Sequence, residues 1–160
     1  MKSLSMFLRF CPLFFITGCI SYEPDFITPQ NVRIYLDGVS VRRQDMSDAV
    51  EVLLGNLTPK NSSYVRKYLS NNNFHILFSD RSIFCGSQKS YGCFDGYNIE
   101  IYVPDCPFSG ALAHEFTHFS MKINSGDADN NHDSGMFCED PNVCYENTSQ
   151  KMLSVICQSE

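Results

Sequence analysis

The 160-residue sequence lacks several features that would each indicate a different class of protein. It contains no Cys-x-x-Cys pair, although it has 8 cysteines, and this argues against a zinc site built from paired thiolates. Its N-terminal apolar run, residues 10–16, is much shorter than the roughly 20 apolar residues that cross a membrane. It shows no internal repeat and no low-complexity tract, so one compact domain is the expected organisation.

The first eighteen residues have the layout of an export signal. Lys2 and Arg9 precede the apolar run, which ends in Ile16-Thr17-Gly18-Cys19. These last four residues resemble the lipobox of bacterial lipoproteins, and the resemblance implies a signal peptide over residues 1–18 and a lipid anchor at Cys19. The alternative is an ordinary secretory signal with an incidental cysteine. Both interpretations predict an exported protein, and the first anchors it to a bacterial membrane, facing the periplasm or the cell exterior.

An excess of basic residues is also missing. Residues 19–160 keep all 18 acidic residues against 10 Lys and Arg, a net charge of −8. This balance argues against nucleic acid as a partner and against docking on anionic lipid by charge. Residues 19–31 contain Pro24 and Pro29 and show no periodicity, so we expect a lipid-anchored tether there, with the folded domain over residues 32–160.

Apolar periodicity predicts an α+β domain. Alternation predicts strands, three- and four-residue steps predict helices, and the Gly-, Ser- and Cys-rich stretch 81–95 is expected to be a stapled loop. Ser109 can cap the third helix, and Gly126 stands where a C-terminal glycine cap belongs. The expected strands are 32–36, 74–78 and 97–103, and the expected helices are 44–57, 62–69, 110–124 and a short one near 149–156.

Six cysteines remain once Cys11 is assigned to the signal and Cys19 to the anchor. An even number in an exported domain predicts disulfides, and six cysteines allow about 15 connectivities. Short-range pairs, Cys85 with Cys93 and Cys138 with Cys144, are one guess among these. The six candidates are Cys85, Cys93, Cys106, Cys138, Cys144 and Cys157.

The segment His114-Glu115-Phe116-Thr117-His118 has the most informative spacing in the chain. His114 and His118 are four residues apart, so on a helix both imidazoles project from one face and can bind one tetrahedral ion. Glu115 lies about 100° further round the helix, outside the ligand set but beside it. A carboxylate at that place suits a general base.

This His-Glu-x-x-His helix resembles that of the zincin metallopeptidases, and the resemblance extends more loosely to the strand before it. It implies a small zincin-like domain with a mixed sheet, an active-site helix and stabilising disulfides. It further implies Zn²⁺ as the cofactor, His114 and His118 as ligands and Glu115 as the base, with a peptide or protein as substrate. Zincins pair an extended substrate with the free edge of a strand, and by analogy we expect residues 98–103 to do so.

A catalytic zinc site usually has three protein ligands and one open position, so the chain must supply one more ligand. The metzincin extension is absent, because Met121 and Asn124 stand where that family has a glycine and a third histidine. His132 is favoured, since a loop that turns back at Gly126 can return its imidazole to the ion. An aspartate or a glutamate stays an alternative: Asp127, Asp129, Glu139 and Glu146.

Other interpretations of these residues stay open. Residues 127–133 have the oxygen spacing that opens a calcium-binding loop, but His132 and Cys138 stand where that loop needs glycine and glutamate. His75, within a predicted strand, is expected to be structural.

Two functions therefore follow from the sequence. The first is a zinc-dependent metallopeptidase, expected to be a monomer. The alternative is a non-catalytic, zincin-like lipoprotein that acts as a metal-stabilised binding module. An inhibitor or immunity-type protein has only small size and disulfides in its favour.

Overall fold

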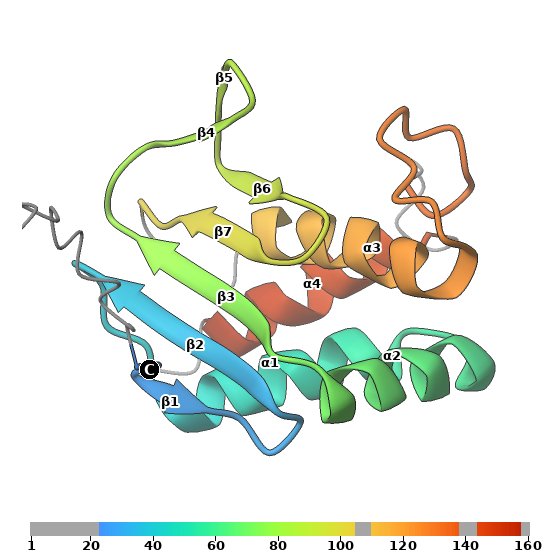
Figure 1. The fold of residues 1–160 in the computed structure, drawn as a ribbon, viewed down its shortest axis with the longest axis horizontal. Coiled ribbons are helices and arrows are strands. Elements are labelled where there is room, and N and C mark those ends of the chain that lie inside the picture. Colours follow the sequence, from blue (N-terminus) through green and yellow to red (C-terminus); the bar gives the residue numbers. More distant parts are fainter. Residues whose placement is uncertain (1–22, 105–109, 138–143, 158–160) are drawn as a thin grey trace, which may run out of the picture.

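The computed structural model describes residues 23–104, 110–137 and 144–157, with side chains through Ser154. The fold is α+β, and a five-stranded mixed sheet has the strand order β1-β2-β3-β7-β6 (Figure 1). Strands β4 and β5 form a separate two-stranded hairpin. The strands are β1 (Phe26–Ile27), β2 (Val32–Asp37), β3 (Phe74–Ser79), β4 (Ile83–Cys85), β5 (Gln88–Ser90), β6 (Gly92–Phe94) and β7 (Ile99–Tyr102). The helices are α1 (Arg43–Gly55), α2 (Pro59–Asn71), α3 (Gly110–Ser125) and α4 (Tyr145–Cys157).

Three parallel strands, β2, β3 and β7, form the centre of the sheet. Their alternating sequences place one row of apolar side chains on the face that the helices cover (Figure 1). The opposite face carries mixed side chains such as Tyr35, His75 and Glu100. The fully buried row consists of Val32, Ile34, Ile76, Phe78, Ile99 and Ile101.

Helices α1 and α2 make the crossover that a parallel β2–β3 pair requires. The sequence placed Pro59 after the first helix and began the second at residue 62. In the structure Pro59 instead opens α2, and the Thr58 hydroxyl accepts a hydrogen bond from the Asn61 N–H at 3.3 Å. Proline suits this first position because the N–H that it lacks has no partner within the helix.

The folded domain begins before Val32. Strand β1 pairs antiparallel with β2, and Phe26 belongs to the hydrophobic core. These residues lie inside the segment 19–31 that we expected to be a tether. The error arose because a two-residue strand is too short to show alternation.

The segment 81–95, expected to be a loop, contains the β4–β5 hairpin and strand β6. Strand β6 pairs antiparallel with β7 on one side and forms an edge of the sheet. Strand β7 is therefore an inner strand, paired with both β3 and β6. The expectation that residues 98–103 offer a free edge to a substrate is wrong, and within the described residues β6 is the edge strand on that side of the sheet.

The expected pairing of Cys85 with Cys93 is confirmed, and the disulfide ties β4 to β6. Cys144 is disulfide-bonded as well. Cys106 and Cys138 lie outside the described residues, as does the side chain of Cys157, so the remaining pairs stay a prediction.

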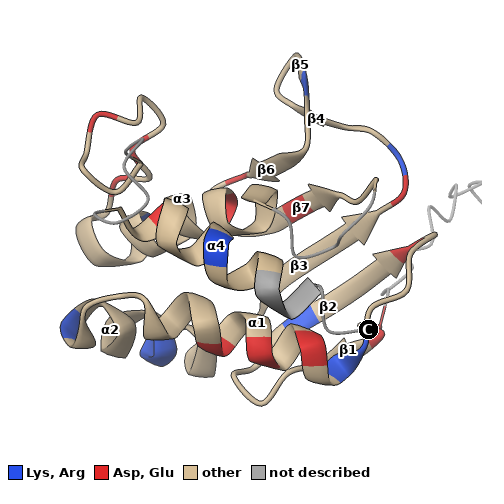
Figure 2. Cartoon of the chain, turned by 180° about the vertical axis from the view of Figure 1, so that it is seen from behind, with Lys and Arg blue, Asp and Glu red and all other residues tan. Residues whose placement is uncertain are grey.

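Within the three described ranges, no helix is long and apolar enough to cross a membrane. Lys and Arg are scattered over α1, α2, α4 and the β4–β5 hairpin, and acidic side chains recur on α1 and on the loop after α3 (Figure 2).

Candidate metal centre

Helix α3 carries His114, Glu115 and His118 and is fixed by its apolar residues. Leu112, Phe116 and Phe119 are buried in the core, and the Phe119 ring stacks on Phe74 of β3 with centroids 4.0 Å apart. The helix ends as predicted at Gly126, whose φ of 83° and N–H bond to the Lys122 carbonyl form a left-handed cap. The core thus determines which way the remaining face of α3 points.

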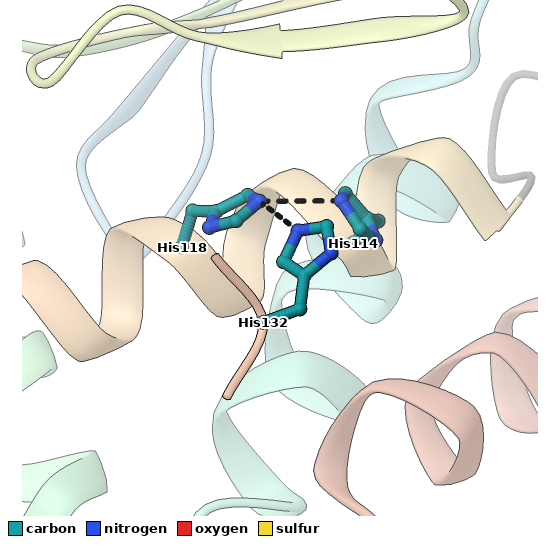
Figure 3. Close-up of side chains that lie close together, drawn as sticks. All are labelled: His114, His118 and His132. Carbon is teal, nitrogen blue, oxygen red and sulfur yellow. Dashed lines mark hydrogen bonds between the residues drawn. The ribbon is translucent and has the colours of Figure 1, made fainter. Parts of the chain in front are cut away.

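Three imidazoles meet beside this helix (Figure 3). The Nε2 atom of His118 lies 3.2 Å from Nε2 of His114 and 3.1 Å from Nε2 of His132. Each of the three residues offers a ligand atom, and these atoms all lie within 4.8 Å of one another. The three histidines can therefore bind one metal ion.

Two of the three separations between ligand atoms fit a tetrahedral site, and the third, between His114 and His132, is at most 4.8 Å. With zinc–nitrogen bonds of about 2.0–2.1 Å, two ligand nitrogens of a tetrahedron lie about 3.3–3.4 Å apart. The two Nε2 separations in the cluster, 3.2 and 3.1 Å, are close to that value. His132 is exposed and His118 is buried, so the cluster opens to solvent on the His132 side.

A backbone carbonyl fixes the orientation of His118. Its Nδ1 lies 2.7 Å from the Ala128 carbonyl oxygen, which can only accept, so Nδ1 carries the proton. In the neutral ring this leaves the Nε2 lone pair directed at the centre of the cluster. Histidine ligands of metals commonly have such a partner on the outer nitrogen.

The loop after α3 returns His132 to the helix and is held by Asp129. The Asp129 carboxylate accepts hydrogen bonds from the backbone N–H groups of Asp133 at 3.2 Å and Ser134 at 3.0 Å. The Asp129 carbonyl accepts the His132 N–H at 2.9 Å. Both Asp129 and His132 have a positive φ, 55° and 57°, so the chain turns sharply at each.

The acidic alternatives for the third ligand occupy other places. Asp127 accepts the Asp129 N–H, and Asp129 accepts two backbone N–H groups, so neither carboxylate belongs to the converging donors. The use of Asp129 to hold backbone also differs from the cation ligation that a calcium loop requires. Glu139 lies outside the described residues.

Glu146 of α4 lies next to His114, on the side of the ring that faces away from the centre of the cluster. Its Oε1 lies 3.9 Å from Nδ1 of His114, the nitrogen that faces away from Nε2. This distance is too long for a hydrogen bond, and Glu146 instead accepts one from the Gln150 side-chain amide. Burial raises the pKa of the Glu146 carboxyl. Glu146 therefore lies behind a ligand, outside the ligand set.

Burial keeps two of the imidazoles, those of His114 and His118, unprotonated and able to bind a cation. Burial, together with the neighbouring imidazoles of His118 and His132, lowers the pKa of His114 to about 4. Burial likewise lowers the pKa of His118. Phe137 adds to this apolar environment, because its ring centroid lies 5.2, 4.5 and 4.5 Å from those of His114, His118 and His132. Unprotonated imidazoles bind metal without first releasing a proton.

Glu115 is 7% exposed and lies under strand β6. Burial raises its pKa to about 7, although a hydrogen bond from the Phe94 backbone N–H acts in the opposite direction. A bound dication nearby would lower this value and favour the carboxylate. The residue is thus a buried acid that changes charge close to neutral pH.

The remaining histidine behaves differently. His75 lies on the face of the sheet away from the helices, with its ring 5.2 Å from Tyr35, and it is not part of the cluster. Sequence reasoning missed the Ala128 carbonyl, Phe137 and Gly92, because a backbone acceptor, a loop phenylalanine and a strand glycine carry no recognisable spacing. Ser109, the expected cap of α3, lies outside the described residues.

No protein-family model matches the chain, and no curated protein and no solved structure matches it either.

Proposed function

We propose that the protein is a zinc-dependent metallopeptidase that hydrolyses peptide bonds with Glu115 as the general base. One observation carries the proposal: three imidazoles converge, with His118 Nε2 at near-tetrahedral spacing from those of His114 and His132, and the residue after His114 on the same helix is a buried carboxyl. Core histidines need neither the third imidazole nor the adjacent acid. Zinc, when bound, would supply Lewis-acid activation of water and of the scissile carbonyl.

The chain's own residues account for the proton transfer. A Glu115 oxygen takes a proton from the attacking water and passes it to the departing amine nitrogen, as a general base and then a general acid. Its pKa of about 7, further adjusted by a metal, suits both directions of transfer near neutral pH. His118 stays fixed meanwhile through its bond to the Ala128 carbonyl.

The free edge of β6 is a surface on which an extended peptide can pair. Tyr91 and Asp95 bond to β7, so the backbone groups of Gly92 and Phe94 point the other way. The Gly92 N–H donates there to the Ser90 hydroxyl and the Phe94 N–H to Glu115, so the two carbonyls are the groups that a peptide can pair with. Both carbonyls belong to β6, the strand that covers the Glu115 side chain. A substrate strand added there would bring its backbone close to the base.

We further propose that the chain is exported and held at a bacterial membrane through acylated Cys19. The signal layout before that residue supports this proposal. Metabolic labelling with a fatty-acid analogue should mark the wild-type protein and leave Cys19→Ala unlabelled.

The first test is metal content by mass spectrometry on protein produced in an oxidising compartment. We expect one zinc per chain, with affinity lowered at least about tenfold in His132→Ala. His75→Ala is the matched control, since it removes the histidine outside the cluster and should keep the zinc. Well-folded protein without bound metal would contradict the proposal and favour a binding module.

The second test separates catalysis from metal binding. Glu115→Gln should keep zinc and lose hydrolysis of a quenched-fluorescence peptide library by about a hundredfold or more, the range of a general base. Equal turnover in this variant and in wild type would rule Glu115 out as the base.

A further inference from the structure

We propose that strand β6, tied by the Cys85–Cys93 disulfide, positions the general base Glu115. On this view Gly92, Phe94 and the disulfide govern turnover and leave metal binding unchanged. The inference rests on the proposed peptidase function, and it concerns the one residue of the site that the imidazole cluster does not hold.

Gly92 touches Glu115 directly. A Cβ atom at position 92 would lie 2.6 Å from Cγ and 2.8 Å from Oε1 of Glu115, closer than real Cβ contacts allow. The backbone at Gly92, unlike that at Gly38, Gly86 or Gly96, is not in the positive-φ region that favours glycine. Space for the Glu115 side chain therefore explains the glycine here, and any side chain at position 92 must displace the carboxylate.

Phe94 holds the other end of the same carboxyl group. Its backbone N–H points away from β7 and donates to the Glu115 carboxylate. Its ring packs edge-on against Phe119 of α3, with centroids 6.1 Å apart, so this end of β6 is seated on the helix. The stem of Glu115 thus meets the backbone of Gly92, and its oxygen meets the amide of Phe94.

Cys93 stands between these two contacts and carries the disulfide. Strand β6 is three residues long and, within the described residues, pairs only with β7. A short edge strand opens more easily than an inner one. The bond to Cys85 adds a second attachment, to the β4–β5 hairpin. Without it β6 can shift from its place, and the base moves with it. The imidazoles are held separately, by α3 and by the loop around Asp129.

Two changes test this coupling in the full exported chain. Gly92→Ala and the double variant Cys85→Ser/Cys93→Ser should each lower kcat about tenfold or more, within the range that a general base contributes. Zinc affinity should stay within about twofold of wild type, since a mispositioned base removes no ligand. Gly55→Ala is the matched control, because a Cβ there meets no atom within 4 Å. Unchanged kcat, or zinc affinity that falls with kcat, would overturn the inference.

A double-mutant cycle identifies the residue through which β6 acts. In a Glu115→Gln background, Gly92→Ala should lower the residual kcat less than about twofold, because the base is already lost. A full tenfold loss in that background would mean that Gly92 acts elsewhere, and would sink the inference.

Amide hydrogen exchange at Phe94 tests the contact without any substrate. Because this N–H faces the open edge of β6, we expect Glu115→Ala to speed its exchange, and opening the disulfide to do the same. Equal exchange rates in wild type and in Cys85→Ser/Cys93→Ser would overturn the coupling whatever the activity. If Phe94 responds as expected and zinc-loaded wild type cleaves no peptide, the proposed function falls and only the structural contact remains.

Discussion

Helix α3 and the loop Gly126–Phe137, which we term the ligand loop, bring imidazoles to one point by different physical means. The helix is fixed by buried apolar side chains, of which Phe116 and Phe119 are almost fully enclosed. The ligand loop has few such contacts and is fixed by hydrogen bonds around Asp129. Hydrophobic packing thus positions His114 and His118, and polar bonding positions His132.

The difference separates stability from metal affinity. Apolar burial on the helix contributes to the global free energy of unfolding, because those residues join the single core. The bonds of the ligand loop join the buried carboxylate of Asp129 to backbone N–H groups of the exposed Asp133 and the half-buried Ser134, and they act on one short turn, so their loss should be felt locally. Changes on the helix should therefore lower global stability more than zinc affinity, and changes in the ligand loop should do the reverse.

The largest effect is expected from Phe116→Ala. It removes a fully buried aromatic ring that also packs against Phe119 with centroids 5.3 Å apart. The free energy of unfolding, measured by denaturant titration, should fall by about 3–5 kcal/mol. The fraction that remains folded should still bind one zinc. A loss below about 1 kcal/mol would mean that packing does not dominate on the helix.

Asp129→Ala should give the reverse pattern. The turn that presents His132 loses its acceptor, so zinc affinity should fall about 10- to 100-fold, as it does when groups that orient a ligand are removed. Global stability should fall by only about 1 kcal/mol, because water can reach the freed N–H groups. Competition with a zinc chelator measures the first quantity and denaturant titration the second.

Asp129→Asn and Asn131→Ala sharpen that result. The amide oxygen that replaces the carboxylate in Asp129→Asn can still accept one hydrogen bond, so this variant should recover part of the affinity. Asn131 is exposed, and its truncation should leave zinc binding unchanged. If Asn131→Ala weakens zinc as much as Asp129→Ala, the loop acts through its general order and not through Asp129.

The pH dependence of the metal-free protein should show two opposing slopes. His114 has a folded pKa of about 4 against an ordinary 6.5, so between these values the unfolded state binds more protons and stability rises with pH. Glu115 has a folded pKa of about 7 against 4.5, so there the folded state binds more protons and stability falls as pH rises. In wild type the two slopes oppose each other between about pH 4.5 and 6.5, with the lowered pKa of His118 adding to the first and the raised pKa of Glu146 to the second.

Glu115→Gln should expose the hidden slope. Without the opposing carboxyl, the unfolding free energy of the chelator-treated protein should rise by about 1–2 kcal/mol from pH 4.5 to 6.5, a figure reduced because His114 is partly exposed. Denaturant midpoints at several pH values measure it. A variant with the same pH profile as wild type would show that Glu115 does not titrate in this range.

Much of the fold could be predicted from the sequence because periodic apolar residues determine it. Strands β2, β3 and β7 and helices α1 and α3 alternate or repeat over enough residues to be recognised. Strand β6 could not be, since Gly92-Cys93-Phe94 is too short to show a period. Because β6 was not recognised, the sequence analysis took β7 for the edge strand of the sheet.

The site divides in the same way. His114, Glu115 and His118 are fixed relative to one another by helix geometry alone, which is why five residues of sequence were informative. The sequence favoured His132 over the acids of the same loop because the chain turns back at Gly126, but its actual position depends on two positive-φ turns and on bonds to Asp129, which the sequence did not reveal. Sequence spacing is enough to place candidate ligands on a helix. A candidate ligand on a loop can be placed only when the hydrogen bonds that shape the loop are known.

The smallest effect is expected far from the site, at the ion pair between α1 and α2. Arg66 meets both oxygens of Glu51, at 3.0 and 2.7 Å, and the hydrogen bond from Arg66 is the main cause that lowers the pKa of Glu51 to about 2. Because the folded pKa is lowered, the Glu51 carboxylate contributes stability at pH values above its ordinary pKa of 4.5, and this contribution is lost as the pH falls towards 2. Both side chains are nearly half exposed, so solvent screens the pair.

Glu51→Gln should therefore lower the free energy of unfolding by less than about 1 kcal/mol at pH 7, with a smaller loss in about 1 M salt and none near pH 2. Asp48→Asn, which removes an acid one turn earlier on α1, is the control and should change stability less. Zinc affinity should be unaltered in both variants. An effect of Glu51→Gln on zinc would break the separation between the two regions, because it would mean that the helical layer, and not the ligand loop, limits how His132 reaches the ion.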